Sequence, residues 1–194
     1  MTRQEIYNNI RYNENLVNQY LNTINRLNST ISDLNSQISN CEYQISQLNS
    51  EIRNRQSQIS ELNQLRNKYQ KLQTDFADRQ SVRINSFNSN FSRNVNVNFM
   101  SSYVIGMRSL LSGNEYRNAY NGISAAIHTI SNKIYAIESE IDNLNRSIIS
   151  SQATINNCRR DIGIYQNQIA GESSKLSYRR QRIVYWKNQL RYAR

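Results

Sequence analysis

The chain has 194 residues, a formal net charge of +10, no proline and five glycines, none of which precedes Gly106. This composition suits long uninterrupted helices, because proline and glycine are the residues that a helix interior tolerates least. No stretch is apolar for long enough to suggest a membrane-spanning helix, and the N-terminus is too polar for a signal peptide. We therefore expect a cytoplasmic protein, which would be exported only by a route that reads a folded helical signal.

Residues 1–80 are expected to form the first arm of a coiled coil. From Ile10 to Leu62, apolar residues recur at steps of three, four or seven, which is the spacing of a heptad seam. After Leu62 the apolar residues fall one position early, at Leu65, Tyr69, Leu72 and Phe76. This shift predicts an interruption of the heptads, at which the coiled coil would be overwound.

Residues 81–115 are expected to form an apolar connector. Residues 95–99 alternate like a strand, residues 100–111 are typical of a short amphipathic helix, and Ser112-Gly113 predicts a stop before an N-cap at Asn114. The connector can be a helical head that packs on itself, or a partly exposed tip that docks on a protein or, less favourably, on a membrane. The candidate docking residues are Phe87, Phe91, Phe99, Met107 and Leu110.

Residues 116–194 are expected to form the second arm. Its apolar seam runs from Tyr116 to Leu190 and is broken only by Ser151, Glu172 and Arg179. A seam of this length must be buried against another helix, and the first arm supplies one. The predicted fold is therefore all-α: a long antiparallel two-helix coiled-coil hairpin with a short helical, apolar tip. An intermolecular coiled coil would satisfy the same heptads, but the break in periodicity and the glycines favour the hairpin.

The two cysteines, Cys41 and Cys158, can share one layer of this hairpin, because the neighbouring seam residues then also match. They are candidates for a disulfide between the arms, which would require an oxidising compartment and hence export. The alternative is a pair of buried free thiols that act as small apolar residues.

No pattern of catalytic or metal-binding residues stands out. His128 is the only histidine, and it has no cysteine or carboxylate partners at metal-ligand spacing. The sequence also contains no glycine-rich phosphate loop and no nucleophile near a base. We expect a protein that is not an enzyme and that uses no cofactor or metal.

The end of the second arm is basic and aromatic, and it has no acidic residue after Glu172. Such a surface can dock a protein, can bind nucleic acid, or can be a solvated face with Trp186 in the seam. Nucleic acid is the least favoured of these, because no nucleic-acid-binding motif is present and the cations point in different directions around the helix. The residues concerned are Arg179, Arg180, Arg182, Tyr185, Lys187 and Arg191.

Residues 111–120, Leu-Ser-Gly-Asn-Glu-Tyr-Arg-Asn-Ala-Tyr, resemble the turn of the WXG-type superfamily, and most of all that of YwqH-like proteins associated with LXG toxins of Gram-positive type VII secretion. Those proteins carry W-x-G at the turn, where Leu111 and Gly113 stand here. The resemblance extends over about residues 30–150. Leu111 replaces the tryptophan, and no tyrosine is followed four positions later by an acidic residue, so the export signature of some members is absent.

The resemblance implies a targeting or chaperone-like factor that binds the helical N-terminal domain of a secreted toxin, with a second small helical protein as a further partner. Two other functions stay open. The protein can be a self-associating coiled-coil scaffold, or a membrane-active helical hairpin that inserts its tip.

Overall fold

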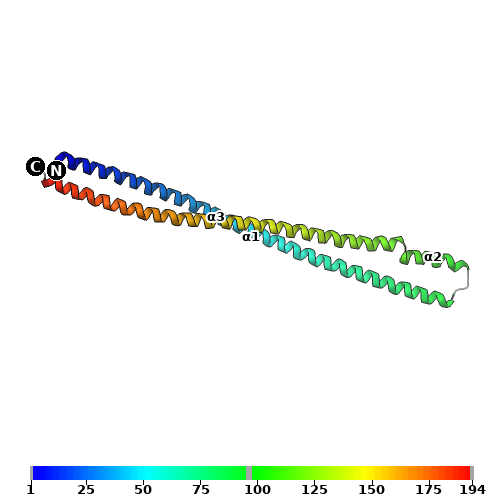
Figure 1. Cartoon of the computed structure of the whole chain (residues 1–194). Coiled ribbons are helices and arrows are strands. Elements are labelled where there is room, and N and C mark those ends of the chain that lie inside the picture. The colour runs from blue at the N-terminus through cyan, green and yellow to red at the C-terminus, as the bar shows by residue number, and fades with distance from the viewer. Residues whose placement is uncertain (1, 95–97, 193–194) are drawn as a thin grey trace. The chain divides into compact units, whose positions relative to one another are not determined.

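A computed structural model describes the backbone of residues 2–94 and 98–192, and the side chains of these ranges except those of residues 90–94, 98–101 and 112. Three α-helices follow one another: α1 (Arg3–Asn94), α2 (Asn98–Ser112) and α3 (Asn114–Tyr192) (Figure 1). The described residues contain no strand. The long helix α1 packs antiparallel against α3, which confirms the predicted all-α coiled-coil hairpin with a short helical tip.

The helix boundaries correct one expectation about the connector. Helix α1 runs past residue 80 to Asn94, so it includes the first part of the connector. The strand-like alternation expected over residues 95–99 is wrong at its end, because α2 already begins at Asn98. Residues 95–97 lie outside the described residues. The short helix predicted from Met100 to Leu111 is confirmed as α2.

The chain divides into two units, which we name the terminal unit (Met1–Leu48 with Arg146–Arg194) and the tip unit (Asn49–Asn145). In each unit a segment of α1 lies antiparallel to a segment of α3, and the tip unit also contains α2. Each unit is held by its own part of the apolar seam.

The core of the terminal unit includes two apolar clusters along the seam. Each well-buried aliphatic side chain contributes roughly 1.5–3 kcal/mol, so the seam supplies most of the stability of helices whose surfaces are rich in Asn and Ser. One cluster comprises Ile6, Ile10 and Trp186, with Ile183 and Leu190 packed against them. The other comprises Ile38, Ile155 and Cys158, with Leu34, Cys41, Ile45 and Ile162 packed against them.

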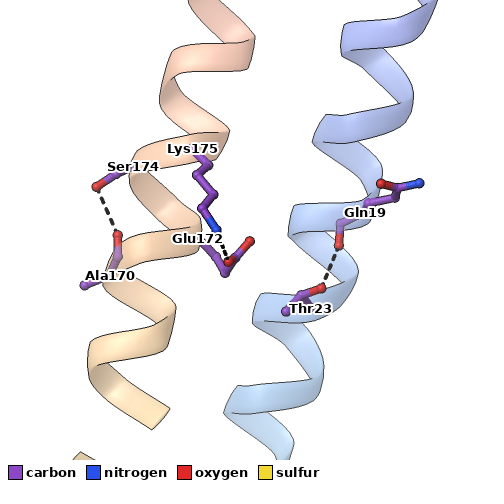
Figure 2. Close-up of polar contacts among 6 residues, drawn as sticks. All are labelled: Gln19, Thr23, Ala170, Glu172, Ser174 and Lys175. Atoms are coloured by element: carbon purple, nitrogen blue, oxygen red, sulfur yellow. Dashed lines mark hydrogen bonds and ion pairs between the residues drawn. The ribbon is translucent and has the colours of Figure 1, made fainter. Parts of the chain in front are cut away.

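Polar residues within this seam are satisfied by specific partners. Asn13 is 3% exposed; its Nδ2 donates to the carbonyl oxygen of Asn9 (2.7 Å), and its Oδ1 accepts from Nη1 of Arg179 (3.3 Å). Figure 2 shows Glu172, another polar seam residue, on the side of α3 that faces α1, with Nζ of Lys175 2.7 Å from its Oε1. The hydrogen bond to Glu172 and the charge of Glu172 raise the pKa of Lys175 above its ordinary value.

Hydroxyl groups on the helix surfaces bond to their own helix. Oγ1 of Thr23 donates to the carbonyl oxygen of Gln19 (3.0 Å), and Oγ of Ser174 donates to that of Ala170 (3.0 Å) (Figure 2). Serine and threonine inside helices commonly bond in this way to the carbonyl four residues earlier. These bonds explain how long helices carry so many hydroxyl side chains.

The seam of the tip unit corrects the predicted heptad interruption. Leu65 and Leu72 are 41% and 51% exposed, whereas Arg66 and Gln73, one position later, are half-buried. The steps of three and four therefore continue past Leu62 without a shift. Nε2 of Gln73 donates to Oγ of Ser124 on α3 (2.6 Å), so a polar pair occupies a seam layer where the prediction expected leucine.

Candidate functional site

The turn between α2 and α3 consists of Gly113 alone. The backbone N–H of Arg117 donates to the carbonyl oxygen of Gly113 (3.2 Å), so Gly113 occupies the N-cap position of α3 and the expected N-cap at Asn114 is wrong. A Cβ atom at residue 113 would overlap the carbonyl oxygen of Ser109. Glycine is therefore required here by space, although no described residue has a positive φ.

Side chains of α1 fix the two helices that meet at this turn. Nε2 of Gln80 donates to the carbonyl oxygen of Leu111 in the last turn of α2 (2.6 Å). Phe76 stacks on Tyr116 of α3, with ring centroids 4.9 Å apart and an interplanar angle of 9°. Tyr116 in turn stacks on Tyr120 at 6.0 Å. The three helices thus converge on one aromatic and polar junction in the tip unit.

Two grooves flank this junction. The larger, which we name the junction groove, has a volume of about 450 Å³ and is lined by Phe76, Arg79, Gln80, Arg83, Leu110, Leu111, Glu115 and Tyr116. The smaller has a volume of about 240 Å³ and is lined by Ile84, Phe87, Asn88, Arg108 and Leu111. Both grooves combine apolar walls with arginine side chains, so they suit an apolar segment that carries acidic groups.

The predicted tip residues divide between these surfaces. Phe87 is half-buried and lines the smaller groove, Met107 is half-buried on α2, and Leu110 is 57% exposed at the junction groove. The side chains of Phe91 and Phe99 lie outside the described residues. The outer face of α2 adds Ile105, which is 68% exposed and which the sequence analysis did not single out.

A third groove in the tip unit surrounds the exposed Leu65. It has a volume of about 500 Å³ and is lined by Arg55, Gln58, Glu61, Leu62, Leu65, Lys133 and Ile137. Nε of Arg55 lies 3.0 Å from Oε2 of Glu140 across the two helices. Sequence reasoning missed this groove because it assigned Leu65 to the seam. A heptad count continued past Leu62 without regard to polarity would have placed Leu65 on the surface.

In the terminal unit, the structure brings two of the predicted basic residues onto aromatic rings. The Arg179 guanidinium lies over the rings of Tyr12 (5.9 Å) and Tyr178 (5.4 Å). The Arg182 guanidinium lies over those of Tyr185 (4.9 Å) and Trp186 (5.0 Å). The ring of Tyr185 also meets that of Trp186 edge to face at 4.9 Å.

The remaining predicted basic residues have more ordinary surroundings. Nζ of Lys187 lies 3.3 Å from Oε1 of Glu14 on α1. Arg180 and Arg191 are exposed on α3. The basic aromatic end therefore contains one ion pair to α1, two arginines held on rings and two solvated arginines.

Cys41 and Cys158 belong to the same core cluster, as the predicted register requires, and both are free thiols. Cys158 is buried, and its Sγ lies 3.6 Å from Oε1 of Gln37. Beside this layer, Nη2 of Arg159 lies 3.1 Å from Oε1 of Glu42. The structure thus describes two thiols packed in the seam, and no disulfide joins them.

Within the described part of the chain, no group of three or more His, Cys, Asp or Glu side chains is placed to hold a metal ion. His128 is exposed on α3. None of the helices, as far as the structure describes them, is both long and apolar enough to cross a membrane. Comparison with known proteins finds no matching family model, curated protein or solved structure.

Proposed function

We propose that the protein is a non-enzymatic binding partner that receives a helix of another protein at the junction groove. The observation that carries this proposal is the exposed aliphatic surface next to the groove. Leu110 lines the groove and is largely exposed. Ile105 is a second exposed aliphatic residue of α2, on another side of the helix. Exposed aliphatic patches beside a groove are typical of surfaces that another protein covers.

The charges of the groove specify the partner further. Two of the lining residues, Arg79 and Arg83, are basic, and one, Glu115, is acidic. An amphipathic helix would therefore bind best if it placed apolar residues on Leu110 and acidic residues next to the two arginines, because opposite charges across an interface favour the correct partner.

The resemblance at residues 111–120 supports a narrower identity for this partner. We propose the helical domain of a secreted LXG-type toxin, for which the protein would act as a targeting or chaperone-like factor of type VII secretion. The steric requirement for glycine at residue 113 supports the comparison, because the same position is a glycine in the turn motif of those proteins.

Co-expression tests this proposal. The tagged protein would be purified together with the helical domain of an LXG toxin encoded beside its gene. We expect a stable complex that is lost in the double variant Ile105→Glu/Leu110→Glu. The matched control is Ile149→Glu, which changes an equally exposed aliphatic residue of the terminal unit. Absence of a complex, or equal loss in the control, would contradict the proposal.

Self-association is a second candidate function, favoured by the exposed Leu65 and Leu72. These leucines lie seven residues apart on one face of α1, and Leu65 lines the 500 Å³ groove. A second copy of the chain could cover them, as in a coiled-coil scaffold. Light scattering decides this point: a dimer that becomes monomeric in Leu65→Glu/Leu72→Glu supports the scaffold, and a wild-type monomer excludes it.

A further inference from the structure

We propose that the end of the terminal unit binds single-stranded nucleic acid, with Arg179 and Arg182 as the phosphate-binding residues. This activity is separate from helix binding by the tip unit. It depends on three observations: guanidinium groups that lie over aromatic rings and have no carboxylate partner among the described residues, a stretch of helix without acidic residues, and tyrosine rings exposed beside the cations.

The balance of charge at this end is strongly positive. After Glu172, α3 carries only basic charges. Two carboxylates of the same unit are already engaged, because Glu172 pairs with Lys175 and Glu14 pairs with Lys187. Among the described residues, no carboxylate lies within ion-pair distance of Arg179 or Arg182. Their charges are therefore available to an external anion.

The two guanidinium groups are also positioned in advance. Arg179 lies over Tyr12 and Tyr178 and donates to Oδ1 of Asn13, and Arg182 lies over Tyr185 and Trp186. A guanidinium that lies over a ring still has N–H edges able to bind the oxygens of a phosphate in pairs. Because the side chains are already held, binding an anion costs little additional side-chain entropy.

The exposed apolar surface at this end consists mainly of aromatic rings. Along the described end of α3 after Glu172, Val184 is the only exposed large aliphatic residue. Bases stack on aromatic rings and phosphates pair with the cations between them, whereas a helix that docks by its apolar face is usually anchored by aliphatic side chains in a hydrophobic groove. The observations thus favour nucleic acid over a helix that docks by aliphatic side chains. The exposed rings are those of Tyr7, Tyr12, Tyr178, Tyr185 and Tyr192.

Sequence reasoning ranked nucleic acid last because the cations point in different directions around the helix. The structure changes this ranking for two of them. Arg179 and Arg182 are three residues apart, so they lie on neighbouring positions of the helix surface. Each of them also rests against a tyrosine on the same side. A stacking surface with cations between its rings is the usual form of a sequence-tolerant single-strand site.

The binding test uses the full-length protein and a fluorescein-labelled oligothymidylate of twenty nucleotides, with anisotropy measured over a series of salt concentrations. Trp186 is the only tryptophan and contacts Arg182, so its emission reports binding at this end directly. In Arg179→Gln/Arg182→Gln, we expect weaker binding and a slope of log K against log salt that is smaller by about 1.4, since each lost phosphate contact removes about 0.7 from a single-strand slope.

Two controls separate a specific site from general attraction to a basic protein. Lys68→Gln/Lys71→Gln removes the same charge from exposed residues of the tip unit and should leave the slope unchanged. Tyr178→Leu/Tyr185→Leu keeps the cations and should weaken oligothymidylate binding about fivefold or more through lost stacking. Circular dichroism of each variant checks that the helices are intact.

The outcomes are distinguishable. The proposal would be overturned if the arginine double variant and the lysine double variant changed the salt slope equally. It would also be overturned if the emission of Trp186 did not change when the oligonucleotide binds. Poly-glutamate of equal charge is the first competitor. If it displaces the oligonucleotide, and if the tyrosine variant binds the oligonucleotide as tightly as the wild type, the ligand is an acidic protein instead. Vesicles of anionic phosphatidylglycerol are the second alternative. If they bind the protein more tightly than the oligonucleotide does, and if Arg179→Gln/Arg182→Gln weakens that binding, the site is a membrane site. None of these results bears on the toxin complex, which is tested at the tip unit.

Discussion

The side-chain amide of Gln80 donates a 2.6 Å hydrogen bond to the carbonyl oxygen of Leu111, and so joins α1 directly to the last turn of α2. The last carbonyls of a helix have no partner within that helix. A residue from another helix satisfies one of them here, beside the one-residue turn that joins α2 to α3. The tip unit therefore depends on a few specific contacts around one short turn.

Replacing Gln80 with leucine is expected to loosen α2. The variant removes the bond to Leu111, and the loss should be about 0.5–1.5 kcal/mol of the stability of the tip unit. Amide hydrogen exchange, resolved by peptide, should rise in residues 103–111. Gln64→Leu is the matched control, because Gln64 is exposed in the same unit. Equal exchange in both variants would show that the bond does not hold α2.

Adding a methyl group at Gly113 should destabilise the tip unit, because the new Cβ would overlap the carbonyl oxygen of Ser109. The same change at Gly122 should have the opposite sign. Nothing lies within 4 Å of a Cβ at residue 122, and alanine is favoured over glycine inside a helix by about 0.5–1 kcal/mol. Thermal unfolding followed by circular dichroism measures both. A neutral Gly113→Ala would contradict the steric argument.

Because the heptads are continuous, we expect two truncations of apolar side chains to alanine to lower the free energy of unfolding by unequal amounts. Ile137 is 1% exposed, and Ile137→Ala should cost about 2–5 kcal/mol, as is usual for a buried aliphatic side chain. Leu72→Ala should stay within about 0.5 kcal/mol, because Leu72 lies on the surface. Urea unfolding gives both values. A large loss of unfolding free energy in Leu72→Ala would instead show that Leu72 lies in the seam, as the spacing of the apolar residues suggests.

The two thiols should be free and unequal in reactivity. Without reductant, a thiol reagent is expected to titrate two groups per unfolded chain. In the folded protein, Cys41 should react before Cys158, because Cys41 is partly exposed and Cys158 is buried. Mass spectrometry after timed alkylation follows each site. An oxidised chain without titratable thiols would instead establish the disulfide between the arms.

Periodicity alone predicted the hairpin, because apolar residues at steps of three and four leave few alternatives to a helix paired along its whole seam. It also predicted the helix of residues 100–111, whereas the stop at Ser112-Gly113 was expected from residue type. It failed between Leu65 and Leu72, because apolar side chains were taken as the only marks of the seam. The bond between Gln73 and Ser124 occupies that seam instead, and such a cross-helix polar pair leaves no trace in a pattern of hydrophobicity.

The candidate sites were predictable only in part. Leu110 and the basic residues were identified, since exposed apolar tips and runs of one charge are visible in the sequence. The positions of Arg179 and Arg182 over aromatic rings were not visible. One of those rings, Tyr12, belongs to α1, more than 160 residues earlier in the chain. Contacts of this kind depend on the register between two helices, which the spacing of apolar residues fixes only approximately.

The uninterrupted heptads of α1 also limit how the length of this protein can change during evolution. A single inserted residue would rotate every later side chain by about 100° around the helix axis, which would turn Gln73 and Gln80 away from Ser124 and Leu111. Insertions and deletions of seven residues keep the seam in phase. Such changes must occur at facing positions of both helices, because otherwise the seam residues of one helix no longer meet their partners on the other. Natural variants are therefore expected to differ in length by matched heptads, and the turn at Gly113 should keep its length in all of them.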